Sequence, residues 1–185
     1  MSQPVTPFLK QAGDFRNWNV YRKAVVICDV TEMFIRRELP RDSRTVDQMR
    51  QAARSCKQNI VEGVTDGAVS VEICIKLLGV AKGSLRELLE DYRDFLRQNK
   101  LTTWEHDDRR TISTRRFCKE HDDAALFVER CECRSAETVA NIMVTQICQL
   151  DYMLAKVIDR VQADFMAQGG IKERMSAVRR QHRGF

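Results

Sequence analysis

Three basic residues with helical spacing are the clearest sign of chemistry in this chain. Arg50, Arg54 and Lys57 are separated by four and then three residues, so on a helix they share one face. No acidic residue lies between Asp47 and Glu62. Such cations can neutralise the phosphates of a nucleic acid and release their condensed counterions. We therefore predict that these three residues contact phosphate, while a solvated ridge without a partner would show the same pattern.

A group of potential metal ligands lies further along the chain. Cys118, His121, Cys131 and Cys133 have the spacing C-x2-H-x9-C-x-C. Four such ligands could in principle close a tetrahedral zinc site, but the paired C-x-x-C knuckles of common zinc modules are absent. We predict that the protein binds no metal and no other cofactor.

Catalytic motifs are not found in the sequence. His106, His121 and His182 lie in polar segments, and none is beside a plausible Ser or Cys nucleophile. The segment GVTDGAVS, residues 63–70, has neither the spacing nor the Lys-Ser/Thr pair of a nucleotide-binding loop. We therefore predict that the protein is not an enzyme.

Four long helices are predicted to position the basic residues. Three prolines and eight glycines leave long segments in which apolar residues recur at steps of three and four. The fold class is predicted to be all-α, an antiparallel four-helix bundle over residues 15–168. A tail at 1–14, an irregular connection at 101–134 and a short basic segment at 169–185 complete the chain. The predicted helices are 15–39, 44–62, 70–98 and 135–168.

The second helix carries local signals at both ends. Thr45 and Gln48 have the spacing of a capping box, and Gly63 is expected to end the helix. Asn59 and Glu62 are expected to be buried and hydrogen bonded, which would fix the turn into the third helix.

Signals in the second half of the chain are fewer. Ser70 is expected to cap the third helix, and Gly79 and Gly83 are expected to allow close approach of a neighbouring helix. Within the connection, one or two short helical pieces are expected around Phe117 and Leu126.

Composition limits the class of protein. The 185 residues suit one domain, and 43% hydrophobic residues are enough for a core. No stretch approaches the roughly 20 apolar residues that span a bilayer, and the N-terminal residues do not form a secretion signal. The seven cysteines are therefore expected to be reduced, in a soluble cytoplasmic protein without a membrane partner.

The net charge of +5 is unevenly distributed. Residues 1–63 contain eleven Lys and Arg against seven Asp and Glu, and residues 135–185 contain seven against five. Residues 64–134 contain thirteen against fourteen, so the basic excess lies on the first two helices and the C-terminal segment. This distribution permits nucleic-acid binding without requiring it.

Several segments carry a family resemblance. RTVDQMRQAARSCKQNIVEG at residues 44–63, ELLEDYRDFLRQ at 87–98 and ETVANI at 137–142 resemble small bacterial four-helix-bundle proteins, which include the products of intervening sequences in 23S ribosomal RNA genes. GGIKERM at 169–175 resembles the subgroup with a four-helix-bundle suffix. The chain departs from the family pattern at Cys148, where a His is expected.

The resemblance extends from about residue 8 to residue 183 and also reaches, more distantly, the accessory proteins of diversity-generating retroelements. It implies a homopentameric barrel of bundles with a basic surface that binds nucleic acid and a reverse transcriptase. Without it, composition and spacing would indicate only a helical domain with a basic ridge.

Together, these features predict a self-assembling protein that binds nucleic acid through electrostatic contacts, and RNA is the expected type. The partners are further copies of the chain and a reverse transcriptase or ribonucleoprotein. Trp18 and Trp104, near helix ends, could add base stacking or could cap a core. The alternative is a protein-only oligomeric scaffold. The predicted nucleic-acid contacts are Arg22, Lys23, Arg36, Arg37, Arg50, Arg54, Lys57, Arg179 and Arg180.

Overall fold

The computed structural model describes residues 15–41, 43–67, 70–168, 176 and 179–180, and every regular element in these ranges is helical. The all-α prediction is confirmed. The predicted tail at 1–14 and the suffix motif at 169–175 lie outside the described residues. The elements are a 3-10 turn η1 (Phe15–Asn17) and the helices α1 (Asn19–Glu38), α2 (Arg44–Gly67), α3 (Val71–Gln98), α4 (Arg109–Glu120), α5 (Ala124–Glu132) and α6 (Ala136–Gln168).

Helix α2 is longer than its sequence indicated. It continues to Gly67, so the prediction that Gly63 ends the helix is wrong. Gly63 is buried, and a Cβ built at this position would lie 3.4 Å from Leu77 Cβ and 3.4 Å from the Leu78 side chain. Gly63 therefore lies in the contact between α2 and α3, where a methyl group would just touch the α3 side chains.

The start of α2 also differs from its prediction. The Ser43 hydroxyl accepts a hydrogen bond from the Thr45 amide at 3.3 Å, so Thr45 lies inside the helix and does not cap it. Asn59 Nδ2 donates to the Ser55 carbonyl at 2.8 Å, one turn earlier in the same helix, and Glu62 is exposed. The expected hydrogen bond that would fix the turn into α3 is not formed by these two residues.

Helix α3 begins as predicted, because the Ser70 hydroxyl accepts a hydrogen bond from the Ile73 amide at 3.3 Å. The expectation for its glycines is wrong within the described residues. Gly79 and Gly83 are exposed, and a Cβ at either position would meet nothing within 4 Å. Neither glycine is needed for packing inside the subunit.

The irregular connection contains two short helices. Helices α4 and α5 include Phe117 and Leu126, as predicted. Each begins at an aspartate whose carboxylate accepts an amide hydrogen of the first turn. Asp108 bonds the Arg110 amide at 2.7 Å, and Asp123 bonds the Leu126 amide at 3.1 Å.

A buried asparagine holds the segment before α4 against α6. The Asn141 carbonyl oxygen accepts from the Trp104 amide at 2.8 Å, and its Nδ2 donates to the Thr102 carbonyl at 2.8 Å. Glu137 accepts the Thr102 amide at 3.1 Å. Because these groups satisfy backbone atoms of a segment without regular secondary structure, residues 101–104 are held against α6.

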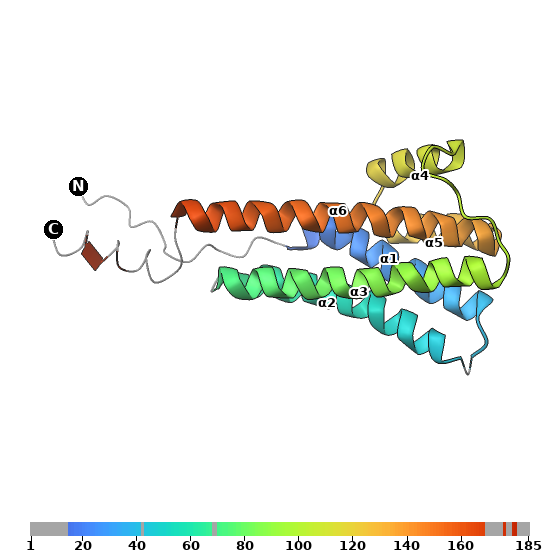
Figure 1. The fold of residues 1–185 in the computed structure, drawn as a ribbon, viewed down its shortest axis with the longest axis horizontal. Coiled ribbons are helices and arrows are strands. Elements are labelled where there is room, and N and C mark those ends of the chain that lie inside the picture. The colour runs from blue at the N-terminus through green and yellow to red at the C-terminus, as the bar shows by residue number, and fades with distance from the viewer. Residues whose placement is uncertain (1–14, 42, 68–69, 169–175, 177–178, 181–185) are drawn as a thin grey trace.

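The four long helices run alongside one another, and α4 lies on the outer side of α6 (Figure 1). Helix α2 packs on α1 and α3, while α6 packs on α1, α3 and α4. Phe34 anchors the core, with its ring centroid 5.0 Å from that of Tyr92 and 4.9 Å from that of Phe95. The buried Tyr92 hydroxyl donates to Thr31 Oγ1 at 3.0 Å, which satisfies both polar groups.

Among the described residues, no helix is both long enough and apolar enough to cross a membrane.

Candidate nucleic-acid interface

The predicted ridge on α2 is only partly basic once α1 packs beside it. Arg50 Nε donates to Glu32 Oε2 at 2.9 Å, and Asp47 Oδ1 lies 3.3 Å from Arg50 Nη1. Glu32 also accepts from Arg36 at 2.7 Å. The hydrogen bonds from Arg50 and then Arg36 lower the pKa of Glu32. Arg50 is therefore largely neutralised by a carboxylate from another helix.

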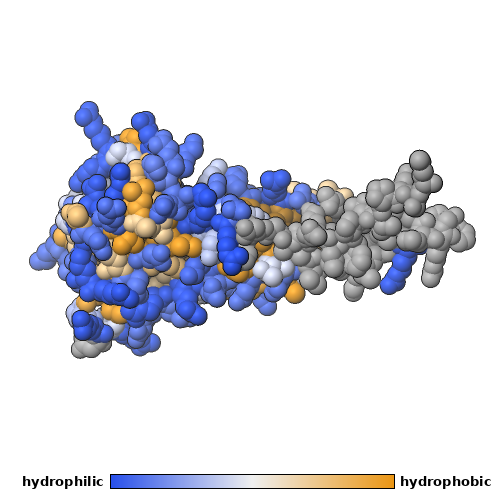
Figure 2. All heavy atoms as spheres, turned by 180° about the vertical axis from the view of Figure 1, so that it is seen from behind, coloured by the Kyte–Doolittle hydropathy of each residue, from blue (hydrophilic) through white to orange (hydrophobic). Residues whose placement is uncertain are grey.

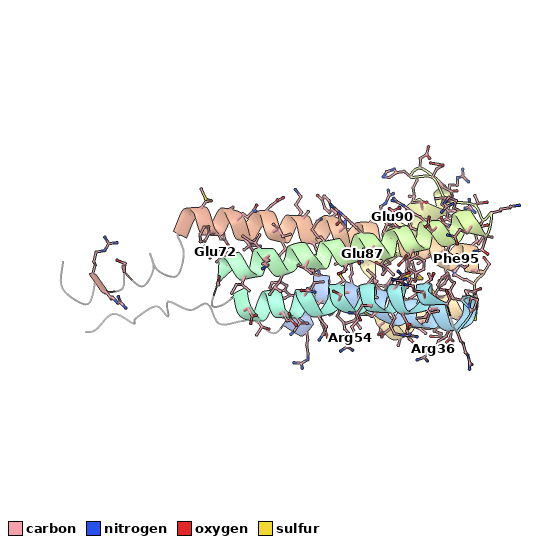
Figure 3. All side chains as sticks on the ribbon, turned by 60° about the horizontal axis from the view of Figure 1, so that its bottom comes forward. Arg36, Arg54, Glu72, Glu87, Glu90 and Phe95 are labelled. Atoms are coloured by element: carbon pink, nitrogen blue, oxygen red, sulfur yellow. The ribbon has the colours of Figure 1, made fainter. Side chains whose placement is uncertain are left out.

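Arg54 and Lys57 form no hydrogen bond or ion pair with another described residue. Arg54 is exposed and projects away from the helices (Figure 3), and Lys57 is half-buried. Burial raises the pKa of the half-buried Cys28 to about 11, although Lys57 and Arg54 lie close enough to favour its thiolate. The ridge thus offers two cations for phosphate, not three.

The predicted cations of α1 have different surroundings. Arg22 Nε donates to Asp122 Oδ2 at 2.7 Å. The Arg36 side chain is 74% exposed. Arg37 donates to three backbone oxygens at the end of α5, Cys131 at 3.1 Å, Glu132 at 2.8 Å and Arg134 at 3.0 Å. Arg37 thereby ties α1 to the last residues of α5 and the turn that follows them.

Lys23 does not belong to the surface, and its prediction as a nucleic-acid contact is wrong. It is 5% exposed. Its ammonium donates to the Cys118 carbonyl, and to Gln146 Oε1 and Gln149 Oε1 at 3.2 Å each. Burial lowers the pKa of Lys23, while Cys118 and Asp122 act in the opposite direction. Lys23 holds α1, α4 and α6 together.

Arg179 and Arg180 are helical and exposed. Exposure is compatible with their predicted contact with nucleic acid, which stays a prediction.

The sequence reasoning missed the most basic helix. Helix α4 carries five cations against one acid, Glu120. Arg109, Arg116 and Lys119 are exposed, and none forms an ion pair with another described residue. Acidic residues elsewhere in residues 64–134 offset the cations of α4, so the net charge of that range did not indicate a basic helix. The run RRTISTRR was the available signal.

A pocket of about 410 Å³ lies between α4, α5, α6 and the segment before α4. Hydrophobic atoms are visible among hydrophilic ones at this end of the molecule (Figure 2). The walls of the pocket combine aromatic rings, small hydroxyl side chains, two thiols and three arginines. The lining residues are Trp104, Arg110, Ser113, Thr114, Phe117, Cys118, Phe127, Arg130, Cys131, Arg134, Thr138 and Ile142.

Two of these arginines lie on aromatic rings. The Arg110 guanidinium carbon is 4.8 Å from the Trp104 ring centroid, and that of Arg130 is 4.5 Å from the Phe117 centroid. Asp108 pairs with Arg110 at 2.7 Å, and this hydrogen bond lowers the pKa of Asp108. Arg130 forms no ion pair with another described residue, so its charge faces only the ring and solvent.

The potential zinc ligands do not converge. Cys118 and Cys131 are buried, whereas His121 and Cys133 are exposed. Burial raises the pKa of Cys118 to about 12 and that of Cys131 to about 11, which disfavours the thiolate that binds metal. In the part of the chain that the structure describes, no three His, Cys, Asp or Glu side chains form a group that could hold a metal.

Known proteins provide no comparison for this interface. No family model, no curated protein and no solved structure matches the chain.

Proposed function

We propose that this protein is a non-enzymatic nucleic-acid-binding protein that assembles with copies of itself and contacts RNA mainly through α4. The charge of α4 carries the proposal. Its exposed cations Arg109, Arg116 and Lys119 have no acidic partner among the described residues, so all three are available to phosphate. Arg54 and Lys57 of α2 form a second, smaller cationic site.

The four long helices are proposed to form an antiparallel bundle of the kind found in the family that the sequence resembles. Successive contacts of α1 with α2, α2 with α3, α3 with α6 and α6 with α1 support this arrangement. In this bundle α4 lies outside α6, and α2 lies on a different side of the molecule (Figure 1). The two cationic sites are therefore testable independently.

Self-assembly is proposed to use the exposed face of α3. Ile73 and Val80 are each 46% exposed, and their spacing of seven residues places them on the same side of α3. Assembly would also repeat the +5 charge of each chain around a shared surface. The pentamer and the reverse transcriptase remain predictions of the family resemblance.

A salt series of binding to a structured RNA tests the proposed function. The logarithm of affinity should fall linearly with the logarithm of salt concentration, by about 0.7–0.9 per phosphate neutralised. Affinity that is absent, or that does not change with salt, would favour the protein-only scaffold.

Three charge-reversed variants then locate the interface. Each changes the net charge by the same amount, so a difference between them reports position. The α4 variant should lose the most affinity, the α2 variant less and the control variant least. Equal losses would mean that only overall charge matters, and unchanged binding would remove the assignment of that helix. The variants are Arg109/Arg116/Lys119→Glu on α4, Arg50/Arg54/Lys57→Glu on α2, and the control Lys100/Lys156/Arg160→Glu, whose wild-type side chains are exposed outside both cationic sites.

A further inference from the structure

We infer that the pocket between α4, α5, α6 and residues 101–108 receives one unpaired base of a single-stranded nucleic acid, with arginines of the pocket contacting the adjacent phosphates. This inference rests on the proposed function and specifies the form of nucleic acid that the protein takes.

The walls of the pocket suit a flat aromatic group. Trp104 and Phe117 are half-buried and line the pocket together with the buried Phe127. The Phe117 and Phe127 rings meet edge to face, with their centroids 5.3 Å apart. Arg110 and Arg130 lie over the Trp104 and Phe117 rings, so a base can stack on the uncovered ring surface or on a guanidinium plane. Such stacking is the main attraction in many complexes with single strands, and it tolerates any base. The volume of about 410 Å³ lies within the roughly 300–1,000 Å³ of pockets that hold small ligands.

The charge of the pocket suits a phosphate. Arg110, Arg130 and Arg134 line it, and no Asp or Glu does so among the described residues. Asp108 offsets Arg110, but Arg130 and Arg134 form no ion pair with another described residue. An apolar ligand would gain nothing from these guanidinium groups, and a cation would be repelled. An anion with a planar aromatic part fits both the rings and the charges.

The concave shape selects an unpaired base. A base within a duplex is stacked and paired, so it could enter only by flipping out of the helix, which is costly. The exposed cations of α4 beside the pocket can contact the phosphates of either form. We therefore expect single strands to use the pocket and the basic face, and duplexes to use the basic face alone.

A pocket-filling variant separates the two modes of binding. Ser113 is exposed and lines the pocket, so Ser113→Trp fills it without removing a core side chain. The matched control is Ile112→Trp, because Ile112 is 47% exposed on the same helix and does not line the pocket. Affinity is measured for a short single-stranded RNA, for its duplex and for adenosine monophosphate.

Ser113→Trp should weaken binding of the single strand at least about fivefold, the lower end of one base stack, and leave duplex affinity unchanged. Ile112→Trp should alter neither. Unchanged single-strand binding by Ser113→Trp would overturn the inference, while salt-dependent binding that requires α4 would leave the proposed function standing. Adenosine monophosphate bound as tightly as the strand would overturn the assignment to a nucleic-acid strand.

Fluorescence provides a second measurement that does not depend on affinity. Trp18 and Trp104 are the two tryptophans, so Trp18→Phe leaves Trp104 as the reporter. The single strand should quench its emission, whereas an abasic strand of equal length should not. Equal quenching by both strands would show that no base reaches the ring, which would contradict the inference.

Discussion

Lys23 illustrates how the surroundings of a single residue decide its role. It follows Val20 by three residues and precedes Ile27 by four, and both are buried. That spacing places Lys23 on the apolar stripe of α1, a signal that a count of cations overlooks. Three oxygens accept hydrogen bonds from its ammonium group, and these bonds offset the cost of burying the side chain.

We predict that Lys23→Met lowers the free energy of unfolding by about 1–3 kcal/mol at neutral pH, because buried acceptors lose their donor. Arg22→Met is the matched control. Arg22 is exposed and ion-paired with Asp122, so its replacement should cost less than about 1 kcal/mol. Urea denaturation measures both. An equal loss in the two variants would contradict a special role for Lys23.

The same variant has a predicted pH dependence. Because burial lowers the pKa of Lys23, the folded protein releases this proton at a lower pH than the unfolded chain, whose pKa is near the ordinary 10.5. Below the folded-state pKa, both states are charged and the full cost of burial is present. As pH rises from that pKa towards 10.5, the stability of the wild type relative to Lys23→Met should increase. A constant or falling difference in denaturation curves would oppose this sign.

Among the elements, α1 carries two adjacent arginines with different partners. Arg37 donates to three carbonyl oxygens at the end of α5, whereas Arg36 is exposed and pairs with Glu32. These partners lie more than 90 residues after Arg37 in the sequence. No local pattern could therefore distinguish the two arginines.

We predict that Arg37→Ala lowers the free energy of unfolding by about 1–2 kcal/mol, since hydrogen bonds to a charged group are lost at a partly exposed site. Arg36→Ala should cost less than about 0.5 kcal/mol. Hydrogen exchange adds a local measurement, in which the amides of α5 should exchange faster in Arg37→Ala alone. Unaltered exchange in α5 would show that Arg37 does not stabilise that helix.

At the scale of the whole molecule, apolar residues on the outside of α3 carry the proposal of self-assembly. We predict that Ile73→Lys combined with Val80→Lys lowers the mass of the assembly measured by light scattering. The stability of the subunit should change little, because both side chains are already partly in solvent. The control is Ile112→Lys, whose wild-type side chain is 47% exposed on α4. A monomeric wild type, or an unchanged mass in the double variant, would remove the proposed α3 interface.

The sequence predicted the long helices and most of their ends, and the clear failure is the end of α2. Apolar periodicity over many residues is a cooperative signal, so the long helices of the structure lie close to their predicted ranges. The end at Gly63 failed because one glycine is weak evidence, and packing on α3 compensates for its cost in a helix. The aromatic and basic pocket could not be foreseen, because its walls come from three helices and a connecting segment.

Composition and local periodicity are enough to establish the all-α class, the approximate positions of the long helices and the number of cations on each. Which of these cations are available depends on the packing of the helices. It placed Glu32 against Arg50, buried Lys23 and left Arg109, Arg116 and Lys119 exposed. The physical reason is that electrostatic interactions act through space, and the nearest opposite charge is often distant along the chain.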